Sequence, residues 1–101
     1  MIQGCAEASA TERYGSGFQQ ALGAGHYRRE KGLVLSSIGV GTYLGEMDEA
    51  TDRASSLAIK RCIEGGVNVI DTAINYRAQR SERVIGRVIQ DLVRSGAVPR
   101  E

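Results

Sequence analysis

The sequence has few residues that could bind a metal or form a disulfide. Its two cysteines, Cys5 and Cys62, are far apart and lack metal or redox spacing, and its single histidine, His26, has no partner at ligand spacing. We therefore predict no metal site and no disulfide, which fits a reducing compartment. Cys62 is expected to be a small apolar residue within a helix. His26 is expected on the surface or in a hairpin.

Long apolar runs and an excess of charge are also absent. No apolar stretch approaches the roughly 18 residues of a membrane span, and the N-terminus lacks the basic head and apolar core of a signal peptide. The net charge of +1 gives no general attraction to nucleic acid or anionic lipid. We expect a cytoplasmic protein that binds neither. Four clustered arginines are expected on a solvated helix face: Arg77, Arg80, Arg83 and Arg87.

The length suits one small domain. A chain of 101 residues is too short for a closed (β/α)8 barrel, which needs about 250 residues. Residues 1–25 are rich in Gly, Ala, Ser and Gln and show no sustained period, so we predict a loose N-terminal arm. Only a few large aromatic side chains could dock this arm on the rest of the protein, namely Tyr14, Phe18 and, just after the arm, Tyr27.

Residues 26–101 predict an α/β domain of alternating strands and helices. A turn at 30–32 predicts a hairpin, residues 38–43 a buried strand, and residues 67–73 a parallel strand buried on both faces. The pattern stops at Pro99, where a third strand should begin, so the sheet is expected to be incomplete.

Two helices are expected between and after these strands. The first spans 50–64 and ends at a pair of glycines, with an apolar face made of Ala54, Leu57, Ala58 and Cys62 and widened by Ile59 and Ile63. The second is expected to begin near Ser81, which is predicted as its N-cap. Its apolar residues recur at helical spacing: Val84, Ile85, Val88, Ile89, Leu92 and Val93.

A glycine-rich run follows the first strand and loosely matches a dinucleotide fingerprint. The run spans residues 39–45, and acidic residues at 46, 48 and 49 come directly after it. Carboxylates would repel a pyrophosphate at a helix N-terminus. A Rossmann-type nucleotide-binding domain is therefore the weaker alternative, and tight packing of glycines at a strand end is favoured.

A second candidate site follows the second strand. Asp71 ends an apolar strand, and an aspartate is costly to bury unless it has a cation or hydrogen-bond donors. Tyr76 lies five residues further on. A phenol can act as a general acid if a neighbouring cation lowers its pKa.

These residues carry a resemblance to a known family. From about Tyr27 to the C-terminus, the chain resembles the aldo-keto reductases in the order, spacing and loop positions of four motifs: Gly41-Thr42-Tyr43, Gly66-Val67-Asn68-Val69-Ile70-Asp71-Thr72-Ala73, Asn75-Tyr76 and Ser81-Glu82-Arg83-Val84-Ile85-Gly86. The resemblance implies the N-terminal part of a (β/α)8 TIM barrel, namely a bottom hairpin and the first two βα units. It also implies reduction of small-molecule aldehydes or ketones with a nicotinamide cofactor, usually NADPH.

The resemblance also implies roles for particular residues. Tyr76 matches the tyrosine that donates a proton to the carbonyl oxygen, and Asp71 matches the aspartate that pairs with the family's lysine. The expected cofactor contacts are Gly41, Thr42, Tyr43 and Asp71, and Thr42 and Tyr43 also match residues that line the substrate pocket.

Half of the family's catalytic set has no counterpart here. The family's lysine and histidine follow later strands, and neither Lys31, Lys60 nor His26 stands at a matching position. The sequence therefore predicts a reductase fragment that is inactive by itself. The alternative is a non-catalytic interaction module, or a remnant, that pairs with another protein through its open strand edges.

Overall fold

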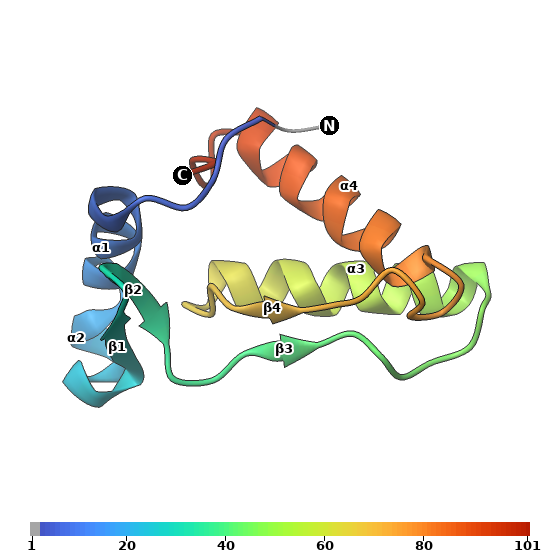
Figure 1. Ribbon diagram of the computed structural model, residues 1–101, viewed down its shortest axis with the longest axis horizontal. Helices are drawn as coiled ribbons and strands as arrows, with labels where there is room; N and C mark the ends of the chain where they lie inside the picture. The colour runs from blue at the N-terminus through green and yellow to red at the C-terminus, as the bar shows by residue number, and fades with distance from the viewer. Residues whose placement is uncertain (1–2) are drawn as a thin grey trace.

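The computed structural model describes residues 3–101 and contains the predicted alternation of strands and helices (Figure 1). In chain order the elements are α1 Ala8–Ser16, α2 Gln19–Leu22, the 3-10 turn η1 Ala24–His26, β1 Tyr27–Glu30, β2 Leu33–Ser36, β3 Val40–Gly41, α3 Glu49–Glu64, β4 Ile70–Asp71 and α4 Arg80–Arg94. The hairpin and α1–α2 lie at one end of the molecule, and β3 and β4 both point towards the other end.

The predicted hairpin is confirmed. β1 and β2 pair antiparallel, with Tyr27 opposite Ser36 and Glu30 opposite Leu33. Lys31 (φ 49°) and Gly32 (φ 83°) form the two-residue turn. Such a turn needs positive φ at both positions, and glycine supplies it without steric cost.

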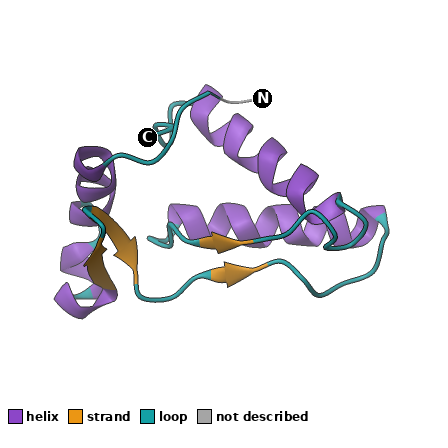
Figure 2. Cartoon of the chain, in the orientation of Figure 1, coloured by secondary structure: helices purple, strands orange, loops and turns teal. Residues whose placement is uncertain are grey.

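β3 and β4 form the predicted parallel pair, but each is only two residues long (Figure 2). Ile38 is 60% exposed, Ile70 is half-buried and Asp71 is exposed. The strand expected at 38–43 is therefore shorter and more exposed than predicted. The strand expected at 67–73 is also shorter, and its burial on both faces is not observed, since only Val67 is fully buried. Among residues 3–101 each strand has a single neighbour, so only a short ladder forms.

The core lies between α3 and α4. It is built from Ile59 and Ile63 of α3 and from Val84, Ile85, Val88 and Leu92 of α4. The stripe predicted for α4 is confirmed, with Ile89 and Val93 at its partly buried margin. The face predicted for α3 is confirmed for Ile59 and Ile63, which are buried, and for Cys62, which is half-buried. It was wrong for the exposed Ala54, Leu57 and Ala58. Apolar residues of α3 lie on more than one side of the helix. The side that carries Ile59 is the one that packs against α4.

Residues 3–25 are not a loose arm, since α1 and α2 dock on the body of the protein. The Tyr14 hydroxyl donates to the Ile63 carbonyl and, at 3.2 Å, to the Val67 carbonyl. Thr11 Oγ1 accepts the Val34 N–H at 3.0 Å. Such long-range contacts stabilise a short helix whose sequence lacks apolar periodicity. Burial raises the pKa of Tyr14, because the charged phenolate would lose hydration there.

Gly66 is the point where the aromatic anchors meet the turn between α3 and β4. Its carbonyl accepts the Tyr27 hydroxyl at 2.7 Å and lies 3.1 Å from His26 Nε2. A Cβ at Gly66 (φ 104°) would stand 2.7 Å from Leu22 Cδ1 and 3.1 Å from Phe18 Cγ. Only glycine allows both this backbone conformation and this close approach.

Replacing Tyr14 with phenylalanine is expected to lower the free energy of unfolding by about 1–2 kcal/mol. The change keeps the ring and removes a donor shared by two backbone carbonyls. Urea denaturation measures the loss. Tyr43→Phe is the matched control, since that ring is 66% exposed, and its unfolding free energy should change by less than about 0.5 kcal/mol. Equal losses in the two variants would contradict the docking contact.

Cys5 is an exposed free thiol, and Cys62 is a half-buried free thiol on α3. Within residues 3–101, no cluster of three or more His, Cys, Asp or Glu side chains is arranged to hold a metal ion. No helix in the same part of the chain is long and apolar enough to cross a membrane.

Candidate active site

The carboxyl ends of β3 and β4 bring together the residues predicted to contact a cofactor. Gly41 stands opposite Asp71 in the parallel register, and Thr42 Oγ1 donates to the Asp71 carbonyl at 2.9 Å. The two strand ends meet at one edge because parallel strands point the same way. Gly41, Thr42 and Asp71 therefore lie side by side.

Two tyrosines from different strand ends pack together at this edge. The rings of Tyr43 and Tyr76 lie 5.1 Å apart between centroids at an interplanar angle of 75°. This edge-to-face geometry places the positive edge of one ring against the negative face of the other. Tyr76 is half-buried, whereas Tyr43 is exposed. The loop after β4 turns at this point, because the Tyr76 N–H donates to the Ala73 carbonyl at 3.0 Å.

The Asp71 side chain is exposed, so this carboxylate does not bear the cost of burial. The lysines and the histidine lie away from it, as their positions in the sequence predict. Lys31 is in the hairpin turn, Lys60 pairs with Glu64 at 3.8 Å on α3, and His26 contacts Gly66.

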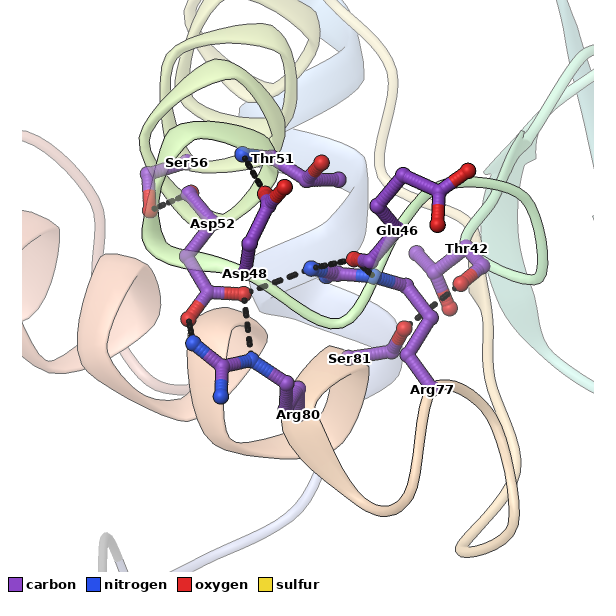
Figure 3. A network of polar contacts seen from close by, with 9 residues as sticks. All are labelled: Thr42, Glu46, Asp48, Thr51, Asp52, Ser56, Arg77, Arg80 and Ser81. Atoms are coloured by element: carbon purple, nitrogen blue, oxygen red, sulfur yellow. Dashed lines mark hydrogen bonds and ion pairs between the residues drawn. The ribbon is translucent and has the colours of Figure 1, made fainter.

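Arg77 is a buried cation that the sequence prediction missed (Figure 3). Its side chain is 2% exposed. Nε and Nη2 donate to the Glu46 carbonyl at 2.9 and 2.6 Å, and Nη2 also donates to Asp52 Oδ1 at 2.7 Å. The expectation of a solvated arginine face was therefore wrong for Arg77. It lies in the loop before α4 and points inwards, where a carbonyl and a carboxylate accept the hydrogen bonds of Nε and Nη2. Among the described residues, its buried Nη1 has no hydrogen-bond partner.

Asp52, in the first turn of α3, accepts hydrogen bonds from two arginines. Arg80 Nη2 donates to Oδ2 at 2.8 Å and Arg80 Nε to Oδ1 at 3.3 Å, beside the bond from Arg77. The hydrogen bonds from Arg80 and then Arg77 lower the pKa of Asp52, against the opposing effect of burial. The same contact raises the pKa of Arg80.

Ser81 is not the N-cap of α4, contrary to the prediction. The helix begins one residue earlier, and the preceding Gln79 (φ 71°) makes no side-chain cap. Ser81 is instead buried, and its Oγ donates to the Thr42 carbonyl at 2.6 Å. The left-handed turn before the helix carries this hydroxyl inwards, so it joins α4 to the end of β3.

The N-terminus of α3 is occupied by the chain's own carboxylate. Asp48 Oδ1 accepts the Thr51 N–H at 2.8 Å, and this hydrogen bond is the main cause of the lowered pKa of Asp48. A pyrophosphate bound in the Rossmann manner would have to displace this negative group. The geometry therefore argues against the alternative of a Rossmann-type domain.

Comparison with known proteins decides the family. The model of the Aldo/keto reductase family matches residues 37–101, which is more than half of the chain. The chain belongs to the aldo/keto reductase family. It is 34% identical over 65 residues to the aldo-keto reductase YhdN of Bacillus subtilis (strain 168), an alignment that covers 61% of this chain and 20% of that protein. The chain thus spans about a fifth of the length of that relative. No solved structure matches.

The matched segment holds every residue of the candidate site, from Gly41 to Ser81. It leaves out α1, α2 and the hairpin, so the docking contacts around Gly66 join a segment outside the match to one inside it.

Acid is expected to weaken this aldo/keto reductase segment through Asp52. A carboxylate whose pKa is lowered by folding contributes stability above its unfolded pKa of about 4. That contribution is lost as the pH falls through the lower pKa of the folded state. Thermal unfolding between pH 7 and pH 2 should show a smaller acid-induced loss for Asp52→Asn than for the wild type. Parallel curves for the two proteins would contradict the arginine contacts.

Proposed function

We propose that this chain carries the proton-donating part of the active site of an NAD(P)H-dependent reductase of small aldehydes and ketones. The observation that carries the proposal is the packing of Tyr76 against Tyr43 at the carboxyl edge of β3 and β4 in a member of this family. Ligands of α/β proteins bind at that edge, where loops present side chains to a common space.

In this proposal the chain's own side chains handle a proton. Tyr76 donates its phenolic proton to the oxygen of the substrate carbonyl while the carbonyl carbon is reduced. The edge-to-face contact with Tyr43 limits the freedom of the Tyr76 ring, so its hydroxyl is held in place. The exposed Asp71 is the proposed partner of the family's lysine, whose charge favours the phenolate that remains.

The edge fits the nicotinamide end of the cofactor, which supplies the hydride when bound. A Cβ at Gly41 would meet nothing within 4 Å, and the Tyr43 and Asp71 side chains are exposed. We assign the contacts with this end to Gly41, Thr42, Tyr43 and Asp71. The nearby Arg77 is already paired with Asp52, so we assign it no phosphate group of the cofactor.

The complete fold and location follow the family in this proposal. β3, α3, β4 and α4 are the first two βα units of a (β/α)8 barrel, the β1–β2 hairpin covers its bottom, and the protein works in the cytoplasm. Neither lysine nor the histidine of residues 3–101 reaches the edge. We therefore propose that the 101-residue chain does not reduce carbonyl compounds by itself.

The test is a reductase assay on the protein as its natural source produces it. Aldehydes of increasing size and either NADPH or NADH are supplied, and oxidation of the cofactor is followed by absorbance. We expect turnover with at least one aldehyde in the natural protein and none with the isolated 101-residue chain. A natural protein that neither binds nor oxidises either cofactor would rule out the proposed function.

A further inference from the structure

The loop that carries Tyr43 is held at both ends by side chains from the neighbouring βα unit (Figure 3). We call residues 42–46 the 42–46 loop. At its start, Ser81 Oγ donates to the Thr42 carbonyl at 2.6 Å. At its end, Arg77 donates twice to the Glu46 carbonyl, at 2.9 and 2.6 Å. Both ends of the loop are thereby fixed to the segment that follows Tyr76.

The Arg77 contact requires a guanidinium group. Its Nε and Nη2 meet one carbonyl together, while Nη2 also reaches the Asp52 carboxylate. A planar fork of donors makes such a set of contacts, whereas a lysine ammonium is a point charge that could replace only part of it. The 2% exposure of the Arg77 side chain means that no water competes strongly for these donors.

The backbone next to Tyr76 is strained where this anchor begins. Arg77, Ala78 and Gln79 follow one another with φ of 51°, 51° and 71°. Residues with a Cβ disfavour this left-handed conformation, and three in succession persist only where the surroundings hold them. The buried contacts of Arg77, at the start of the turn, and of Ser81, just after it, supply that restraint.

The 42–46 loop also has a residue suited to this close approach. Gly45 has φ 120°, and a Cβ there would stand 2.6 Å from Thr51 Cγ2 and 3.5 Å from Arg77 Nε. The loop therefore passes closely between α3 and Arg77, and glycine permits it. Between the two fixed ends, Tyr43 and Leu44 face outwards at the candidate site.

We propose that Arg77 is a positioning residue that acts with Ser81 to clamp the 42–46 loop and hold the Tyr43 ring against Tyr76. The clamp itself follows from the contacts described above. Its consequence for catalysis rests on the proposed reductase function, because the ring of Tyr76 must be held where it can donate its proton. Small displacements of such a group have large effects on rate.

Amide hydrogen exchange tests the clamp without any assay of activity. In Arg77→Met the amides of the 42–46 loop should exchange about tenfold faster, since charge-assisted bonds that close the loop are lost. Arg77→Lys retains the charge that Asp52 needs and keeps the protein folded, but it should also release the loop. Arg87→Met is the matched control, because Arg87 is exposed on α4 and its loss should leave the loop unchanged.

Kinetics of the natural protein test the positioning role. In Arg77→Lys we expect kcat to fall about 10- to 100-fold, because the ring of Tyr76 is misplaced. KM for the cofactor should rise by no more than about threefold, because Gly41 and Asp71, two of the four proposed cofactor contacts, lie outside the released loop. Unchanged loop exchange in Arg77→Lys would overturn the clamp. Faster loop exchange with an unchanged kcat would overturn the positioning role. If the wild-type protein has no reductase activity, the proposed function is wrong. The hydrogen-exchange experiment then still tests whether Arg77 clamps the 42–46 loop.

Discussion

Replacing Tyr76 with phenylalanine is expected to lower kcat for carbonyl reduction about 10²- to 10⁴-fold in the protein as its natural source produces it. The substitution removes the phenolic hydroxyl and keeps the ring that packs 5.1 Å from Tyr43. The binding surface is thus retained while the proton donor is lost. Steady-state kinetics with saturating cofactor and aldehyde measure the effect, which should appear in kcat and leave KM for the cofactor nearly unchanged.

Tyr27→Phe is the matched control for this prediction. Its hydroxyl bonds to the Gly66 carbonyl at the opposite end of the strands, so kcat should stay within about twofold of the wild type. Thermal unfolding of both variants checks that they are folded. A Tyr76→Phe protein with full kcat would show that another group donates the proton, and the proposed role of Tyr76 would be wrong.

Features governed by local sequence were predicted well. The turn at Lys31 and Gly32 needs only two residues with positive φ, and the apolar stripe of α4 is continuous from Val84 to Leu92. The predicted parallel pairing of the two strands is also found, and it sets Gly41 beside Asp71 at one edge. Each of these features follows from a rule that acts over a few residues or between adjacent strands.

Features governed by long-range contacts were not predicted. α1 has no apolar period, and its helix is stabilised by Tyr14 and Thr11, whose partners lie 23 to 53 residues away. Asp52 pairs with Arg77 and Arg80, which lie 25 and 28 residues further along the chain. No pattern in the sequence separates a buried arginine from its solvated neighbours. The left-handed turn that directs Arg77 and Ser81 inwards is likewise not predicted by the sequence, because none of its three residues is glycine.

Replacing Ile59 with alanine is expected to lower the free energy of unfolding by about 2–5 kcal/mol, the largest stability effect of any substitution considered for this chain. Ile59 is 2% exposed and packs with Val84 and Val88 in the core between α3 and α4. Removing three carbon atoms there leaves a cavity that rigid neighbours fill only in part. The free energy of unfolding of a small domain is only about 5–15 kcal/mol, so this substitution would remove a large share of it.

Leu57→Ala is the matched control for this prediction, because Leu57 lies two residues from Ile59 on the same helix and is 56% exposed. Alanine favours a helix slightly more than leucine does, so the unfolding free energy should change by less than about 0.5 kcal/mol. Urea denaturation of both variants gives the two values under the same conditions. The sequence pattern alone put Leu57 on the apolar face of this helix. A greater loss for Leu57→Ala than for Ile59→Ala would restore that assignment and would mean that α3 turns a different side to α4.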